Sequence, residues 1–342
     1  MIVGGVPMLF GGAKAAYVAV AHDTAPFVSA YLWSSAGFGT KFANPATQPS
    51  GTGFGVAFSP ANTQIAVANN GAIGVTAYPW SSAGFGTKFA NPTTGADSDG
   101  NGVAFSSAGT QIAVCHLSSP FVSAYPWSGS GFGTKYSDPA TLPASTGNGV
   151  AFSPAGTEIA VAHAISPYVS AYPWSSSGFG TKFADPATLP AGNGFDVAFS
   201  PAGTQIAISH ALSPFVSAYP WSGSGFGTKY SDPSTLPDGN GRNVAFSPAG
   251  TEIAIAHQIS PFVSAYAWSG SGFGTKYTDP STTPTGTGRG IAFSSTGTEI
   301  AVAHAISPYV SAYPWSSSGF GTKYSNPATP PPDTSYSVAF SN

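Results

Sequence analysis

The stretch VAFSPAGTEIAVAHAISPYVSAYPWS, residues 150–175, contains three short segments in which bulky and small side chains alternate. In the middle segment Ile159 and Val161 fall on one face and Ala160 and Ala162 on the other, which is the period of two that is typical of a β-strand. The turn residues Pro-Ala-Gly-Thr separate the first two segments. Together with the GFGTK that follows, the stretch predicts four short antiparallel strands.

This unit recurs along the whole chain of 342 residues. The third segment of every copy ends in a tryptophan, and each tryptophan lies 47 positions after the last: Trp33, Trp80, Trp127, Trp174, Trp221, Trp268 and Trp315. A fixed period of about 20 to 50 residues is typical of solenoids, propellers and repeat arrays. No window shows a helical period of comparable length, so each repeat is predicted to be a four-stranded β-sheet.

Each predicted sheet has a bulky face and a small face, so it can bury the bulky face against the small face of the next copy. A ring of such sheets buries both faces and leaves no exposed end. The sequence therefore predicts an all-β fold, a closed seven-bladed β-propeller with four-stranded blades and a 47-residue repeat. The chain starts in the middle of a unit, and its last segment, YSVAFSN, is a first strand with nothing after it. We expect this C-terminal strand to join the N-terminal blade and close the ring.

The seven residues that occupy one position of the repeat form a column. Two columns in the third and fourth predicted strands have expected structural roles. Pro173 lacks a backbone N–H donor and is expected to mark where the third strand stops or bulges. The lysine that ends GFGTK is expected to keep the outermost strand from pairing with other sheets, and to pair weakly with the Asp or Asn three residues on. These lysines are Lys41, Lys88, Lys135, Lys182, Lys229, Lys276 and Lys323.

The hairpin VAFSPAGTEIAVA resembles the first hairpin of a WD40-type repeat, and PYVSAYPWS stands where that family ends its third strand with a Trp-Asp pair. In this chain Ser follows each Trp, and no Gly-His pair precedes the first strand, so the repeat is WD40-like. The segment YPWSGSGFGTKYSDPATLP is also similar to repeat proteins encoded by tailed phages from aquatic environments. The first resemblance implies a propeller, and the second implies a phage component.

Composition excludes several kinds of partner. A charged fraction of 7% and a net charge of −3 leave no basic patch for nucleic acid. No run reaches the roughly 18 apolar residues of a membrane helix, so no membrane insertion is expected, and the apolar N-terminus lacks the basic residues of a secretory signal. The single cysteine, Cys115, excludes an internal disulfide and is expected to be a buried thiol.

All six histidines occupy one column of the repeat, where Asn69 takes the seventh place: His22, His116, His163, His210, His257 and His304. Equivalent positions of a propeller lie on a circle around its axis, so these imidazoles cannot converge on one ion at the ~2.0–2.1 Å that zinc requires. We expect each ring to bond turn backbone at the end of its strand. The sequence predicts no metal site and no cofactor.

Catalytic candidates are weak in this sequence. The loop DSDGNG, residues 97–102, fits the first half of a calcium-binding loop, but Ala108 stands where the bidentate Glu should be, which favours a simple turn. Ser, His and Asp recur in separate columns, and no copy carries a G-x-S-x-G elbow. The chain shows almost no departures from the repeat, so we expect no catalytic residue and no enzyme activity.

Residues 1–12 are predicted to be an N-terminal arm outside a single propeller domain of residues 13–342. The arm segment MLFGG also aligns with a first strand, but the C-terminal copy matches better and is expected to take that place. The apolar residues Met8, Leu9 and Phe10 are therefore candidates for an assembly contact. The arm either folds over one mouth of its own propeller or docks on a neighbouring subunit.

These features predict a non-enzymatic structural or interaction protein. The expected role is a component of a virion or an extracellular assembly, such as a capsid decoration, a fibre or a tail accessory, made in the cytoplasm and acting through the propeller faces and the arm. Its expected partners are other protein subunits or surface glycans. The alternative is an intracellular interaction scaffold or a carbohydrate-binding propeller, because propellers host many functions.

Overall fold

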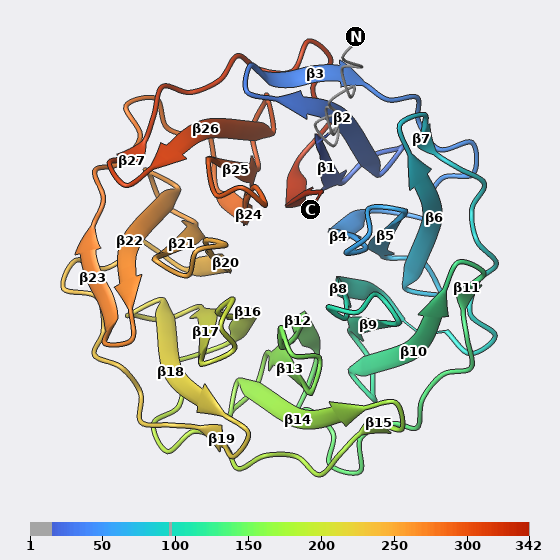
Figure 1. Cartoon of the computed structure of the whole chain (residues 1–342), viewed down its shortest axis with the longest axis vertical. Coiled ribbons are helices and arrows are strands. Elements are labelled where there is room, and N and C mark those ends of the chain that lie inside the picture. Colours follow the sequence, from blue (N-terminus) through green and yellow to red (C-terminus); the bar gives the residue numbers. More distant parts are fainter. Residues whose placement is uncertain (1–15, 96–97, 342) are drawn as a thin grey trace, which may run out of the picture.

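Seven antiparallel sheets of four strands each surround a central axis in the computed structural model, which describes residues 16–95 and 98–341 (Figure 1). Blade 1 consists of β28, β1, β2 and β3, and blades 2 to 7 use the remaining strands in chain order, four to a blade. The predicted seven-bladed, all-β propeller is confirmed. The described residues contain no helix, and hence no helix that could cross a membrane.

The first, second and third strands are nearly identical in length in all seven blades, whereas the fourth strands have two or five residues. The first, innermost strands are β4 (Gly53–Phe58), β8 (Gly100–Phe105), β12 (Gly147–Phe152), β16 (Gly194–Phe199), β20 (Gly241–Phe246), β24 (Gly288–Phe293) and β28 (Ser335–Phe340). The second strands are β1 (Ala16–His22), β5 (Gln64–Asn69), β9 (Gln111–His116), β13 (Glu158–His163), β17 (Gln205–His210), β21 (Glu252–His257) and β25 (Glu299–His304). The third strands are β2 (Val28–Ser34), β6 (Val75–Ser81), β10 (Val122–Ser128), β14 (Val169–Ser175), β18 (Val216–Ser222), β22 (Val263–Ser269) and β26 (Val310–Ser316). The fourth, outermost strands are β3 (Gly37–Lys41), β7 (Gly84–Phe85), β11 (Gly131–Phe132), β15 (Gly178–Phe179), β19 (Gly225–Phe226), β23 (Gly272–Lys276) and β27 (Gly319–Phe320).

β28 closes the ring by pairing antiparallel with β1, although the two strands come from opposite ends of the chain. Next to this pairing, Ser341 N–H donates to Tyr17 O at 2.9 Å, and Tyr17 N–H donates to Ser341 Oγ at 2.9 Å. In blade 4, Ser153 and Glu158, which one continuous turn connects, make the same two bonds. The expected closure by the C-terminal strand is confirmed, and it reproduces the first hairpin of an ordinary blade.

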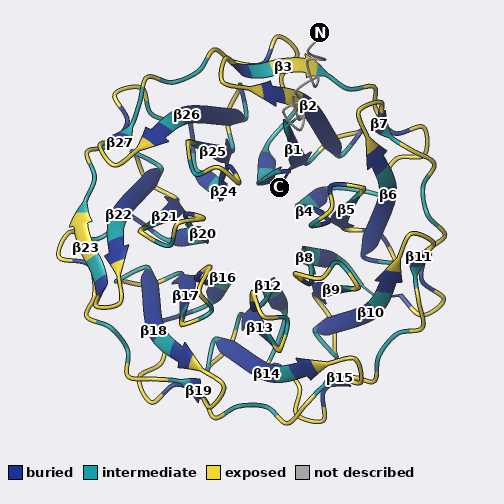
Figure 2. Ribbon diagram, viewed as in Figure 1, coloured by how far each residue is buried: buried dark blue, intermediate teal, exposed yellow. Residues whose placement is uncertain are grey.

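Blades pack with the large side chains of one sheet against the small side chains of the sheet before it. Between blades 3 and 4, Tyr172 and Trp174 form one apolar cluster with Ala113 and Ala124. Figure 2 shows the inner parts of the third strands buried all around the ring. Since a buried tyrosine or tryptophan removes about 150–250 Å² from water, these junctions contribute a large share of the apolar burial.

The tryptophan column is a packing column. Trp174 meets Tyr136, Phe152 and Phe179 edge to face, with ring centroids 5.2, 5.3 and 4.9 Å apart. Such pairs are more favourable than their buried area alone. The seven tryptophans are each 3 to 7% exposed: Trp33, Trp80, Trp127, Trp174, Trp221, Trp268 and Trp315.

The proline of the third strand shortens the fourth strand and leaves the third intact. β14 continues through Pro173, which lies opposite Glu158, to its end at Ser175, so the expectation that the third strand stops or bulges there is wrong. Pro173 O accepts from Gly180 N–H at 2.8 Å, so the missing N–H of Pro173 also faces the fourth strand. The five blades with this proline have fourth strands of two residues, whereas the blades with Leu32 or Ala267 have fourth strands of five.

In six of the seven blades, a glycine at the start of the first strand lets the blade approach the blade before it. A Cβ on Gly194 would lie 2.4 Å from Tyr168 O, and one on Gly241 would lie 2.3 Å from Phe215 O. These carbonyls belong to the turn between the second and third strands, where His163 N–H donates to Tyr168 O at 3.0 Å. Because this glycine lies directly against a backbone carbonyl of the preceding blade, the close contact positions the start of the first strand, including the two residues that follow the glycine.

Gly194→Ala should destabilise the propeller, because the new Cβ overlaps a backbone oxygen that is held by its own hydrogen bond. We expect a loss of about 1–3 kcal/mol, visible as a lower Tm in differential scanning calorimetry. Gly223→Ala is the matched control, since a Cβ there meets nothing within 4 Å. Equal Tm values for the two variants would contradict the close approach at Gly194.

Candidate functional site

Two positions of the first strand depart from the repeat. Six of the seven first strands begin with Gly, and all seven end in Val or Ile, Ala and Phe, whereas their second and third residues vary. The second residues are Phe54, Asn101, Asn148, Phe195, Arg242, Arg289 and Tyr336. The third residues are Gly55, Gly102, Gly149, Asp196, Asn243, Gly290 and Ser337. Both arginines of the chain belong to this set.

These two variable columns line a cavity. The first strands that carry them surround the axis of the propeller (Figure 1). An outer part of about 170 Å³ is lined by the seven second residues alone. An inner part of about 190 Å³ is lined by both columns. Along each first strand the second residue precedes the third, and only second residues line the outer part. The outer part therefore lies toward the face of the propeller at which the loop from the preceding blade leads into the first strand.

Asp196 is the one acidic side chain among the described residues that line the cavity. Its Oδ2 accepts from Asn243 Nδ2 at 2.6 Å and from Val244 N–H at 3.2 Å. Its Oδ1 faces Gly149, where an added Cβ would lie only 2.5 Å away. Burial raises the pKa of Asp196 to about 7, although the hydrogen bonds from Val244 and Asn243 act in the opposite direction. This carboxyl therefore holds its proton to a higher pH than an exposed aspartate does.

Asparagine side chains tie neighbouring first strands together around the cavity. Asn101 Nδ2 donates to Gly147 O at 2.9 Å, and Asn148 Nδ2 donates to Gly194 O at 2.8 Å. In both cases the acceptor belongs to the first strand of the following blade. These bonds fix the orientation of the two amides in the cavity wall.

The cationic side of the cavity belongs to blades 6 and 7. Arg242 and Arg289 line both the outer and the inner part. Each guanidinium lies over an aromatic ring: Arg242 Cζ is 4.4 Å from the centroid of Phe195, and Arg289 Cζ is 4.8 Å from that of Tyr336. A carboxyl that titrates near neutral pH, placed in one cavity with two guanidiniums, can combine proton transfer with the binding of an anionic ligand.

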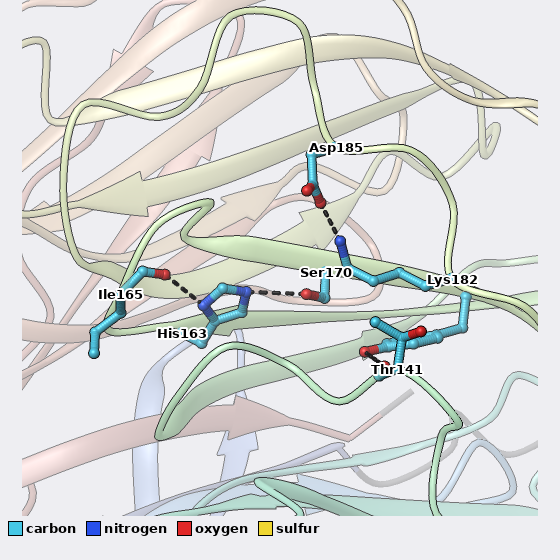
Figure 3. A network of polar contacts seen from close by, with 7 residues as sticks. Thr141, His163, Ile165, Ser170, Lys182 and Asp185 are labelled. Atoms are coloured by element: carbon cyan, nitrogen blue, oxygen red, sulfur yellow. Dashed lines mark hydrogen bonds and ion pairs between the residues drawn. The ribbon is translucent and has the colours of Figure 1, made fainter.

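The histidines predicted as one column lie at the ends of the second strands, and the axial cavity is lined by other residues. In blade 4, His163 Nδ1–H donates to Ile165 O at 2.8 Å, and the Ser170 hydroxyl donates to His163 Nε2 at 3.0 Å (Figure 3). The Nε2–serine contact, at 2.9 to 3.0 Å, is common to His22, His116, His163, His210, His257 and His304. Within residues 16–95 and 98–341, no three potential metal ligands gather at one point.

The lysine column lies at the rim of the blades. Lys182 pairs with Asp185 (Figure 3), and Lys135 Nζ lies 2.6 Å from Asp138 Oδ1. Where Asn replaces Asp, the contact persists as a hydrogen bond, as between Lys41 Nζ and Asn44 Oδ1 at 2.7 Å. The acidic partners are largely exposed, so these pairs contribute little to stability. The expected pairing of each lysine with the Asp or Asn three residues on is confirmed.

Two predicted features fall outside the described residues. They are the arm of residues 1–12, with Met8, Leu9 and Phe10, and the first ligand of the half calcium loop, Asp97. In the described part of that loop, Ser98 Oγ accepts from Ser118 N–H at 3.0 Å. The arm and its two alternative docking sites stay predictions.

The expectation that departures from the repeat are almost absent is wrong. Asp196, Arg242 and Arg289 are departures, and they meet on the axis although they belong to different blades. The signal is present in the sequence, because aligning the seven first strands shows two variable residues between a Gly, present in six of the seven, and a constant Val-Ala-Phe or Ile-Ala-Phe.

No protein-family model matches this sequence, and no curated protein matches it. Among solved structures, a protein from Bacteroides fragilis NCTC 9343 described as a "putative 6-phosphogluconolactonase" matches with a TM-score of 0.76, at 11% identity over 98% of this chain and 100% of that one. A protein of the same description from Bacteroides uniformis ATCC 8492 matches with a TM-score of 0.73, at 14% identity over 95% of this chain and 99% of that one. The periplasmic gluconolactonase PpgL of Pseudomonas aeruginosa matches with a TM-score of 0.72, at 17% identity over 96% of this chain and 99% of that one. At these identities the similarity shows the propeller fold.

These comparisons correct the expectation of a non-enzymatic structural or virion component. Solved propellers that share nearly the whole ring are described as a gluconolactonase and as putative 6-phosphogluconolactonases, so a ring of this kind gives no reason to expect a non-enzymatic protein. A uniform repeat does not exclude an active site, because the junctions between blades require only their own residues to be constant. The axial positions are free to vary.

The buried histidines should make the propeller sensitive to acid. Burial lowers the pKa of five of them to about 4: His22, His163, His210, His257 and His304. The unfolded chain binds protons at these residues below about pH 6.5, whereas the folded ring does so only near pH 4. Stability should therefore fall from pH 6.5 to 4, by up to about 1.4 kcal/mol per histidine and pH unit, measured as Tm against pH.

Asn69 supplies the control for this prediction, since Asn69 Nδ2 donates to Thr76 Oγ1 at 3.1 Å and replaces the histidine contact without titrating. A variant with Asn at all five positions should lose most of the pH dependence. Asp196 acts in the opposite sense, because its raised pKa makes the fold more stable at acid pH, but it is one group against five. An unchanged pH slope in the five-Asn variant would refute the assignment.

Proposed function

We propose that this protein is a hydrolase of sugar lactones and that the axial cavity is its active site. The observation that carries the proposal is Asp196, a partly buried carboxyl with its pKa raised to about 7 inside a cavity that two arginines also line. The names of the structural neighbours, putative 6-phosphogluconolactonase and gluconolactonase, support the same reaction class. A carboxyl that titrates near the working pH suits a general base.

Asp196 acts as the base that activates water. Its Oδ2 is held by Asn243 and Val244, and its Oδ1 lies against the bare backbone of Gly149 in the wall of the inner cavity. The carboxylate takes a proton from water as the hydroxide oxygen bonds to the lactone carbonyl carbon. The ring C–O bond then breaks, and the proton passes from Asp196 to the departing ring oxygen, which leaves the open hydroxy acid.

Asn101 is the group we assign to the oxyanion of the tetrahedral intermediate. One N–H of its amide donates to Gly147 O, which fixes the amide plane. The second N–H has no partner among the residues that the structure describes. A preoriented donor of this kind stabilises the charge that develops on the carbonyl oxygen.

Hydrolysis of glucono-1,5-lactone by the full chain, followed by acid release in a pH-stat after subtraction of the uncatalysed rate, tests the proposal. Asp196→Asn should lower kcat/KM by about 10²–10⁴-fold, since the amide cannot accept the proton. The kcat/KM of the unaltered protein should rise with pH through about 7, because Asp196 must be ionised to act as a base.

Asp185→Asn is the matched control, because it makes the same chemical change at the rim, where Asp185 pairs with Lys182. This variant should keep the full rate. A rate equal to the uncatalysed one, or an Asp196→Asn variant as fast as the unaltered protein, would show that the cavity does not catalyse this reaction.

The partners and the location inferred from the sequence, and the resemblance of the repeat to WD40-type and phage proteins, stay predictions. A lactone hydrolase does not depend on any of them.

A further inference from the structure

The two arginines of the chain stand at equivalent places on neighbouring blades. Arg242 is the second residue of β20 and Arg289 is the second residue of β24, exactly one repeat apart in the sequence. The other basic side chains of the described chain are the rim lysines, each beside an Asp or Asn three residues on. The positive charge of the axis is thus confined to one pair.

Aromatic rings hold both guanidiniums without using their donors. Phe195 lies under Arg242, and Tyr336 lies under Arg289. A cation over a ring face is attracted by the π-electrons, while the N–H groups in the guanidinium plane stay available. The Nε atoms of both arginines are buried and have no hydrogen-bond partner among the described residues. The pair therefore presents a set of fixed, unused donors.

The charge of the pair is also unbalanced. Among the described residues, no carboxylate oxygen lies within 4.0 Å of a guanidinium nitrogen of either arginine, so neither arginine forms a salt bridge. Burial lowers the pKa of Arg242, and the neighbouring charge of Arg289 acts in the same direction. Asp196 lines the same cavity but makes no salt bridge with either arginine, so the two neighbouring cations are costly unless a ligand supplies an anion in contact with them.

We propose that Arg242 and Arg289 form a subsite for a phosphate monoester, so that the ligand of the axial cavity is a phosphorylated sugar derivative. A phosphate monoester carries about two negative charges and three acceptor oxygens, which two guanidinium forks match, whereas one fork is enough for a carboxylate. Both arginines reach the outer part of the cavity and Asp196 lines only the inner part. The phosphate thus binds toward the mouth, and the rest of the ligand extends inward to Asp196.

This inference names the substrate class of the site in Proposed function and rests on that function for the identity of the reacting group. The anion subsite itself is measured without any reaction. Isothermal titration of the full chain with inorganic phosphate, with glucose 6-phosphate and with glucose should show binding of the two phosphates and at least tenfold weaker binding of glucose.

Arg242→Gln and Arg289→Gln should each weaken the binding of both phosphates by about tenfold to a hundredfold, since each removes a charged fork. Lys182→Gln removes a positive charge at the rim and should leave the affinity unchanged. Circular dichroism and the Tm of each variant establish that the ring is intact. The subsite would be overturned by equal affinity for glucose and glucose 6-phosphate, or by phosphate binding that both arginine variants retain.

Asp196→Asn separates this inference from the proposed hydrolysis. The variant should lose lactone hydrolysis and keep its affinity for inorganic phosphate. Phosphate binding without any lactone hydrolysis in the unaltered protein would overturn the hydrolase and leave the subsite. Hydrolysis of glucono-1,5-lactone that neither inorganic phosphate nor the arginine variants affect would overturn the subsite and leave the hydrolase.

Discussion

The packing of a tyrosine and a tryptophan from one blade against the alanines of the blade before it determines the whole ring. A β-strand alternates its faces, so β14 presents Tyr172 and Trp174 to blade 3 and presents Val169 and Ala171 to blade 5. Every blade therefore carries both halves of the junction. A single sheet of this kind cannot bury its own apolar faces, and an arrangement that leaves the face with the large side chains exposed to water is not stable. The ring is complete when the last large face has met the first small one.

This constraint explains why the variable residues lie on the axis. The junction residues of the second and third strands must stay the same in every blade, because a change of volume there leaves a void or an overlap. The second residues of the first strands line the outer part of the cavity, and they lie outside the apolar clusters that join neighbouring blades. The third residues lie closer to the next blade, as Gly149 does to Asp196. An acid on blade 5, two cations on blades 6 and 7 and amides on blades 3 and 4 can therefore coexist in one ring without disturbing its packing.

The architecture could be predicted from the sequence because it depends on periodicity, which the sequence shows directly. The period, the two faces of each blade and the closure by the last strand all follow from the order of large, small and turn residues. The consequence of Pro173 was harder to predict, since it depends on which neighbouring strand its missing N–H faces, and only the ladder of hydrogen bonds gives that direction. The axial site could not be predicted from the periodicity, because it consists of residues that differ between the repeats. Asp196, Arg242 and Tyr336 are brought together by the curvature of the ring, and the raised pKa of Asp196 depends on burial by strands from several blades.

The closing strand has a consequence for how the cavity comes into being. Tyr336 lies under Arg289, and it belongs to β28, the strand that the C-terminal end of the chain contributes to blade 1. During synthesis, six blades can be complete while Arg289 still lacks its aromatic support and the cavity lacks a wall. The same pairing that makes the ring continuous thus also finishes the site. A truncated or opened chain would hold most of a propeller but an incomplete site, so the fold couples ligand recognition to the integrity of the entire polypeptide.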